Sequence, residues 1–185
     1  MDTSELKSAT RKAAEGDERA AASLFDHYHP RLYRYALAKL GSHADADEVA
    51  AEVFARVLRD LDRFRWRGGG FEAWIFRIAS NLVVDRVRPA ARKRVGHDPR
   101  IDPRPAAEFG PESLAVEAES SAELRAKLEL LAPDQREVLV LRFAAELDTH
   151  EVGRVMGRRP NAVRQLQFRA LSSLRQMMSE EVNVP

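Results

Sequence analysis

The stretch PNAVRQLQFRALSSLR, residues 160–175, is the most informative part of the sequence for the fold and the function. Proline suits the first position of a helix because its missing N–H has no intrahelical partner there. Apolar residues then recur at steps of three and four, which predicts one apolar helix face: Val163, Leu166, Ala170, Leu174 and Met177. The opposite face carries Asn161, Arg164, Gln165, Phe168, Arg169 and Ser172. Polar side chains of these kinds hydrogen-bond base edges and phosphates, and Phe168 has no core to enter.

A shorter helical pattern comes just before this stretch. Thr149 is a suitable N-cap, and Gly157 is expected to end the helix in the left-handed conformation. A short helix, a glycine turn through Arg158 and a basic helix together predict a helix-turn-helix, whose second helix enters the major groove of DNA. The alternative is an ordinary helical hairpin with a solvated basic face. No Asp or Glu occurs between Val152 and Ser179, and this favours DNA.

Composition narrows the class of protein. The chain has 185 residues, 44% of them hydrophobic and 32% charged, with a net charge of +1 that hides local clusters of each sign. The absence of cysteine excludes disulfides, thiolate zinc sites and cysteine redox sensing. No signal peptide and no apolar run of the roughly 18 residues needed to span a bilayer is present. We therefore expect a cytoplasmic protein that does not insert into a membrane.

The first half of the chain predicts further helices. Apolar residues recur at helical spacing in residues 17–28. Pro30 is expected to end that helix and begin a second one, which Gly41 is expected to stop. Residues 45–64 form one long helical pattern in which residues 44–62 hold six acids against two arginines. After the loop RWRGGG, residues 71–88 are helical again. In residues 63–92 the charge balance reverses, because seven arginines stand against two acids.

The pattern predicts an all-α fold of two small helical domains joined by a flexible, Pro-rich linker, because no alternating strand pattern occurs. The polar residues 1–16 are expected to form a flexible N-terminus, and residues 17–90 the first domain. Residues 91–118 contain several of the prolines and form the linker. Residues 119–180 form the second domain, with the helix-turn-helix at its end.

Four blocks in this order resemble the extracytoplasmic-function (ECF, group 4) sigma factors of bacterial RNA polymerase. The blocks are DADEVAAEVFARVLRDLDRF at 45–64, FEAWIFRIASNLVVDRVR at 71–88, LAPDQREVLVLRF at 131–143 and GRRPNAVRQLQFRALSSLR at 157–175. The resemblance covers nearly the whole chain. It implies an alternative sigma factor that binds core RNA polymerase and promoter DNA and is not an enzyme. It also implies an anti-sigma factor as a further partner.

The resemblance assigns roles to particular residues. The recognition helix would read the −35 element as duplex, through Arg164, Gln165, Phe168, Arg169, Asn161 and Arg158. The −10 element would be read as a single strand with one flipped base. The residues that match or suit this role are Trp66, Asn81, Arg65, Arg67, Arg77, Asp85 and Arg88. The polymerase clamp would be bound by Asp45, Asp47, Glu48, Glu52 and Phe54, and the second domain would dock near the polymerase flap.

The sequence also departs from the family. Ala51 stands where the family commonly has Gln, and Arg159 where a Ser or Thr cap usually precedes the recognition helix. The loop at Arg67–Gly70 is shorter than in some relatives, which leaves the alignment of Trp66 open by about a residue.

Two other functional classes are a stand-alone helix-turn-helix regulator and an enzyme that acts on nucleic acid. The regulator would need a dimer seam, and the enzyme would need a convergent catalytic cluster. Neither feature stands out in the sequence. His27, His29 and His43 lack carboxylate or thiolate companions at ligand spacing, and His150-Glu151 lacks the second histidine of a zinc-protease motif. We therefore expect no metal and no cofactor.

Overall fold

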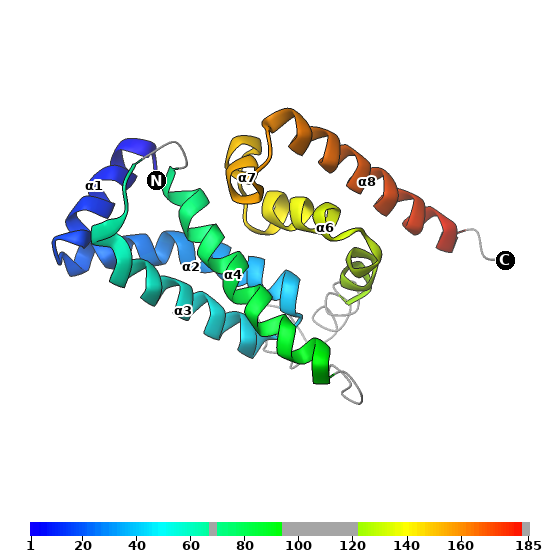
Figure 1. The fold of residues 1–185 in the computed structure, drawn as a ribbon, viewed down its shortest axis with the longest axis horizontal. Coiled ribbons are helices and arrows are strands. Elements are labelled where there is room, and N and C mark those ends of the chain that lie inside the picture. The colour runs from blue at the N-terminus through cyan, green and yellow to red at the C-terminus, as the bar shows by residue number, and fades with distance from the viewer. Residues whose placement is uncertain (67–69, 94–121, 183–185) are drawn as a thin grey trace, which may run out of the picture. The chain divides into compact units, whose positions relative to one another are not determined.

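The computed structural model describes residues 1–66, 70–93 and 122–182, with residues 88–93 and 180–182 as backbone alone. The chain divides into two compact units, Met1–Pro99 and Arg100–Pro185. Every regular element in the described ranges is helical, which confirms the predicted all-α class (Figure 1). None of these helices is long and apolar enough to cross a membrane.

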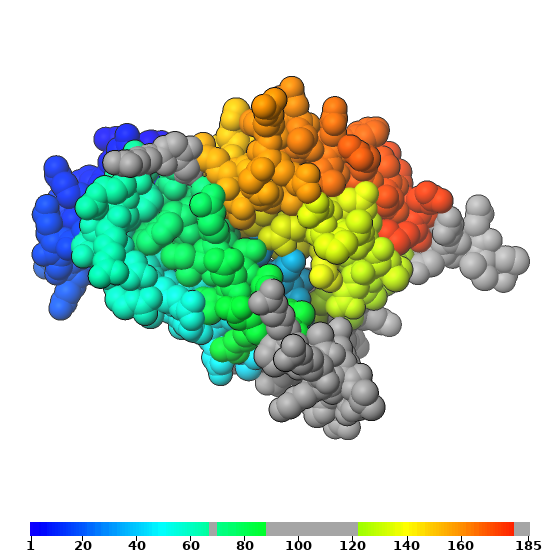
Figure 2. All heavy atoms as spheres, viewed as in Figure 1, coloured from blue at the N-terminus to red at the C-terminus, as the bar shows by residue number. Residues whose placement is uncertain are grey.

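Four helices and a short 3₁₀ turn build the first unit. They are α1 (Thr3–Ala14), α2 (Glu18–Leu40), α3 (His43–Asp60), η1 (Leu61–Arg63) and α4 (Gly70–Lys93). The long helices α2, α3 and α4 pack on one another around a core that includes Tyr28, Tyr35, Val53, Phe71 and Phe76, each fully buried. Because α3 and α4 pack together, the acidic and the basic segments of the sequence lie next to each other at the surface (Figure 2).

The prediction of a flexible N-terminus is wrong. Residues 3–14 form α1, which packs against α2 and η1. Asp2 caps the helix by accepting hydrogen bonds from the backbone N–H groups of Ser4 and Glu5, and the Glu5 carboxylate accepts one from the N–H of Asp2. Leu6 is the large apolar side chain that α1 buries. A single buried leucine gives no recognisable period, so the sequence pattern missed the helix.

Pro30 does not divide α2, contrary to prediction. The helix runs unbroken from Glu18 to Leu40 and stops at Gly41, whose φ of 72° is left-handed as predicted. Pro30 is exposed, while Tyr28 and Leu32 on either side of it are buried. Tertiary packing of the neighbouring residues therefore outweighs the local cost of proline inside the helix.

The next two helices differ from prediction at their ends. The predicted helix 45–64 is divided, since α3 ends at Asp60 and η1 follows. Helix α4 continues past Pro89 to Lys93, beyond the start of the predicted linker. The rest of that linker, from residue 94, lies outside the described residues.

The second unit contains a helical segment over residues 122–130, then α6 (Pro133–Leu139), the π-helical turn η2 (Val140–Ala144), α7 (Thr149–Met156) and α8 (Pro160–Val182). Val138, Leu141, Leu147, Val152 and Val163 are fully buried and form its core. The elements α7 and α8 are the predicted helix-turn-helix.

The ends of α7 define the turn. Asp148, rather than the predicted Thr149, caps α7, and it forms a capping box with Glu151. Gly157 ends the helix in the left-handed conformation, with φ 66°, as predicted. The N–H of Arg158 then donates a 2.8 Å hydrogen bond to the carbonyl oxygen of Gly153, which holds the turn against α7.

Candidate nucleic-acid interface

The exposed face of α8 carries the side chains that the sequence assigns to the −35 element. Val163 and Ala170 are fully buried, so the helix has a fixed orientation in the second unit. Asn161, Arg164, Gln165 and Arg169 are exposed as a result. Phe168 is 73% exposed, which is rare for so large an apolar side chain. Four of these residues line one shallow hollow: Arg164, Gln165, Phe168 and Arg169.

Neighbouring side chains hold two of the arginines that were assigned to the −35 element. Arg158 forms an ion pair with Asp134, at the start of α6. Arg164 donates to the side-chain oxygen of Asn161, one turn earlier on α8. Asn161 therefore orients the Arg164 guanidinium on the face of α8 that carries Phe168, and Asp134 orients the guanidinium of Arg158 in the turn before α8.

Arg142 holds α8 to the rest of the second unit, and the sequence pattern did not indicate this role. Its Nε donates to the side-chain oxygen of Gln167 on α8, 3.3 Å away, and its Nη1 donates to the carbonyl oxygen of Leu147. Arg142 therefore joins η2, the loop before α7 and α8. Its contacts are with residues at least five positions away in the chain, so no local pattern indicates this role.

The structure exposes the predicted −10 residues of α4. Arg77, Asn81 and Asp85 follow one another at four-residue steps and are all exposed. Steps of four place side chains above one another on the same helix face. The Arg88 side chain and all of Arg67 lie outside the described residues.

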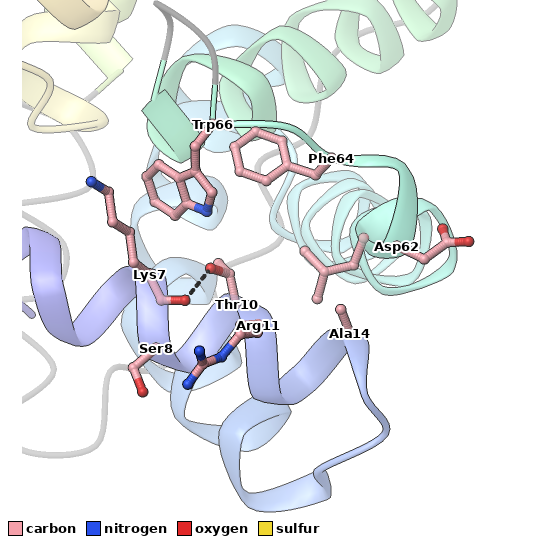
Figure 3. A pocket seen from close by; sticks show the side chains of 9 residues that line it. Lys7, Ser8, Thr10, Arg11, Ala14, Asp62, Phe64 and Trp66 are labelled. Carbon is pink, nitrogen blue, oxygen red and sulfur yellow. Dashed lines mark hydrogen bonds between the residues drawn. The ribbon is translucent and has the colours of Figure 1, made fainter.

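Trp66 lies at the rim of a pocket between α1 and the segment that follows α3 (Figure 3). The side chain is 38% exposed and packs edge-to-face on Phe64, with ring centroids 5.3 Å apart. The ammonium group of Lys7, from α1, lies 5.5 Å from the centroid of the Trp66 ring. The pocket has a volume of about 580 Å³ and is lined by Lys7, Ser8, Thr10, Arg11, Ala14, Leu61, Asp62, Phe64 and Trp66.

Trp66 and Asn81 do not share this pocket. Phe64, which packs beside Trp66, stacks on Trp74 in the first turns of α4, at 4.8 Å between centroids. Asn81 lies seven residues further along α4, or about 10 Å at the rise of an α-helix. The residues that line the pocket come from α1, η1 and the segment after η1, and none comes from α4.

Arg65 has a local role beside this pocket. Its Nη1 donates to the carbonyl oxygens of Asp62 and Phe64, at 2.7 and 3.1 Å. These bonds satisfy backbone acceptors at the end of η1. Arg65 thus supports the segment that carries Trp66.

The predicted clamp-binding acids lie on α3, and three of them, Asp45, Glu48 and Glu52, are paired with arginines of the same unit. Arg86, from α4, donates to Asp45 at 3.0 Å and forms an ion pair with Glu48 at 2.7 Å. The hydrogen bond to Glu48 and the nearby negative charges raise the pKa of Arg86 above its ordinary value. Glu52 is paired with Arg56 on the same helix, 2.5 Å away. Asp47 lies partly exposed on the same helix.

The prediction that Phe54 belongs to the clamp-binding surface is wrong. The Phe54 side chain is only 5% exposed and packs edge-to-face on Phe25, with centroids 5.0 Å apart. A partner cannot contact Phe54 directly, because it belongs to the core. The large apolar side chain that α3 does expose is Leu58, at 41%.

The described residues contain no group of His, Asp or Glu side chains that could hold a metal ion. His43 instead lies 2.5 Å from the hydroxyl of Tyr33, measured from its Nδ1.

Known families match both units. Residues 24–93 match the model of Sigma-70 region 2, and residues 128–176 match Sigma-70 region 4. The chain is therefore built as a two-part sigma factor. It is 36% identical over 188 residues to the ECF RNA polymerase sigma factor ShbA of Streptomyces griseus, covering 97% of this chain and 98% of that one. It is 35% identical over 179 residues to SigD of Mycobacterium tuberculosis, covering 95% and 84%.

One solved structure agrees with this assignment over nearly the whole chain. The structure of CnrH in complex with the cytosolic domain of CnrY matches with a TM-score of 0.71 and 25% identity, over 95% of this chain and 98% of that one. The chain belongs to the ECF RNA polymerase sigma factors. It is an alternative sigma factor that directs transcription initiation, as the four sequence blocks predicted.

Proposed function

We propose that this sigma factor reads the −35 element as duplex DNA through the exposed face of α8. The observation that carries the proposal is the arrangement of Arg164, Gln165, Phe168 and Arg169 around one surface hollow. Arginine and glutamine hydrogen-bond guanine and adenine in the major groove, and an exposed aromatic ring can contact a thymine methyl group. The absence of acids along this part of α8 removes repulsion from the phosphates.

The first unit binds the −10 element as a melted strand. Trp66 offers a partly exposed aromatic ring on which a base can stack, and Arg77 and Asn81 extend the polar surface along α4. Trp66 lines the pocket beside α1 and Asn81 does not, which supports contacts of the two residues with different parts of the strand.

Core RNA polymerase holds both units on the promoter. The acids of α3, with Asp47 and Glu48 among them, suit a basic surface on the polymerase clamp. The second unit docks near the flap. One assembly then binds both promoter elements. The distance between the two elements therefore also determines which promoters are recognised.

An anti-sigma factor regulates the protein by covering these surfaces. The support is the match to CnrH, which was solved with the cytosolic domain of CnrY bound to it. A protein that covers the face of α8 or the acids of α3 would prevent binding to DNA or to polymerase.

Reconstitution tests the function directly. The purified protein is mixed with sigma-free bacterial core polymerase, and transcripts made from fragmented genomic DNA are sequenced. We expect discrete start sites that share two upstream motifs. Co-elution with core but no specific starts, while a control sigma factor is active, would indicate a cryptic promoter or a missing activator. No co-elution would instead favour a stand-alone DNA-binding regulator.

A further inference from the structure

Arg86 continues the buried stripe of α4 with a charged side chain. Ala79, Leu82 and Val83 are buried and stand at positions i, i+3 and i+4 of a helical stripe. Arg86 is the i+7 position of the same stripe, where an apolar residue would extend the packing. Its guanidinium instead reaches α3, the helix that packs against α4 (Figure 1). Packing of the two helices therefore does not explain the charge at this position.

Arg86 is the counter-ion of two acids that are proposed to bind the polymerase clamp. Its Nη1 lies 3.0 Å from Oδ1 of Asp45, and its Nη2 lies 2.7 Å from Oε2 of Glu48. One positive charge thus faces two negative ones, and the three groups together carry a single negative charge. Glu52, a third predicted clamp-binding acid, is paired with Arg56. Much of the negative charge of this surface is therefore neutralised within the protein itself.

Both acids that Arg86 contacts remain accessible to a partner. The side chains of Glu48 and Asp45 are 66% and 50% exposed, whereas that of Arg86 is 30% exposed because it approaches them from α4. An ionised carboxylate can accept more than one hydrogen bond. A second cation can therefore reach the acids from solvent, but Arg86 reduces its attraction to them, because like charges repel.

We propose that Arg86 is an intramolecular competitor of RNA polymerase, which neutralises Asp45 and Glu48 in the free protein and yields them to a basic side chain of the clamp on docking. The inference rests on the proposed function, because it takes the acids of α3 as the clamp-binding surface. The carboxylates exchange one cation for another, so docking leaves neither of them buried without a partner. Arg86 thereby keeps the affinity for core polymerase below the value that the acids alone would give.

Two variants of Arg86 test the competition. Arg86→Gln removes the charge, and Arg86→Met also restores an apolar side chain to the buried stripe of α4. The matched control is Arg59→Gln, because Arg59 is paired at 3.1 Å with Asp60, which is not a predicted clamp-binding acid. Glu48 and Arg59 are eleven residues apart on α3, or about 16 Å at the rise of an α-helix. This exceeds the Debye length of about 10 Å at 0.1 M salt.

Fluorescence titration of sigma-free core polymerase, at two salt concentrations, measures the affinity of each variant. We expect both Arg86 variants to bind core about two- to fivefold more tightly than the wild type at low salt, which is the range that an exposed ion pair contributes. The gain should shrink at high salt, because exposed charges are screened. Arg59→Gln should bind core as the wild type does.

A second background tests whether Arg86 acts through the two acids. Asp45→Asn with Glu48→Gln removes both carboxylates that Arg86 contacts. In this background Arg86→Gln should bring no gain in core affinity, because the two changes affect the same interaction. Circular dichroism and the urea midpoint check that every variant is folded.

Unchanged or weaker core binding by the two Arg86 variants would overturn the inference, because Arg86 would then leave the acids available or position them for the clamp. Equal gains in Arg86→Gln and Arg59→Gln would also overturn it, since the effect would be one of net charge alone. A different result marks failure of the proposed clamp surface: the wild type does not bind core, or the variant without Asp45 and Glu48 carboxylates binds core as tightly as the wild type.

Discussion

Gly153 shows how a single residue fixes the geometry of the helix-turn-helix. A Cβ atom at this position would lie 2.6 Å from the carbonyl oxygen of Arg158, well inside van der Waals contact. That oxygen belongs to the backbone of the turn and cannot move without shifting α8. Glycine is therefore required because α7 and the turn approach each other so closely.

Gly153→Ala is expected to lower the free energy of unfolding of the second unit by about 1–3 kcal/mol, through overpacking. Urea denaturation followed by circular dichroism measures the loss. His150→Ala, at an exposed position of the same helix, is the control and should change stability by less than about 0.5 kcal/mol. An unchanged midpoint for Gly153→Ala would show that the turn can shift at no cost.

Arg169→Ala tests sequence reading at the residue scale. If Arg169 contacts a base, its loss should weaken binding to the preferred −35 element by about 1–3 kcal/mol and relax the preference at one position. Holoenzyme binding is compared across single-base variants of the −35 element. Arg175→Ala removes the same charge further along α8 and should leave the preference unchanged. An unaltered −35 preference in Arg169→Ala would contradict the assignment of Arg169 as a base-contacting residue.

At the scale of elements, α1 depends on its cap. The backbone N–H groups of Glu5 and Ser4 hold the pKa of Asp2 below its ordinary value of 3.8. Because the folded-state pKa is lowered, the stabilisation is fully present above pH 3.8 and is lost as the pH falls through the folded-state pKa. The cap should therefore persist at neutral pH and be lost as the pH falls through the lowered pKa of Asp2.

Asp2→Ala is expected to loosen α1 at neutral pH, because two N–H groups of the first turn lose their acceptor. Amide hydrogen exchange, expressed as protection factors, should show faster opening in residues 3–14 and no change in α3. Lys12→Ala, near the other end of α1, serves as the comparison. Equal protection in Asp2→Ala and the wild type would mean that packing of Leu6 alone holds the helix.

Helices α3 and α4 are linked by Arg86, which reaches both Asp45 and Glu48. These ion pairs are partly exposed, so each contributes less than about 1 kcal/mol to stability. They also fix the position of the acids relative to α4. The surface proposed for polymerase and the helix proposed for the −10 strand are thereby joined within one unit.

At the scale of the whole molecule, docking on polymerase should depend on the charge of α3. Glu48→Lys places a positive charge where a basic clamp surface is expected, and should weaken core binding by about tenfold or more, since like charges at an interface are costly. Fluorescence titration of core polymerase at two salt concentrations measures this. Glu18→Lys, exposed on α2, should bind core as the wild type does. Equal affinities for the two variants would place the clamp surface elsewhere.

The sequence by itself determined the helical class, the helix-turn-helix and the two faces of α8. These features depend on contacts within a few residues: the spacing of Val163 and Ala170, the left-handed Gly157 and the acid-free stretch that follows. Local periodicity and turn chemistry contain that information. The resemblance to sigma factors added the roles of the blocks, and the family matches confirm the class.

Only the tertiary structure decided which side chains meet across the fold. It showed α1 as a packed helix, Pro30 inside an unbroken α2, Phe54 in the core and Arg86 between two acids of α3. It also placed Trp66, but not Asn81, at the pocket beside α1, and it placed Lys7 beside the Trp66 ring. These pairs are distant in the chain, and their contacts arise from packing of whole helices, which no local period of the sequence specifies.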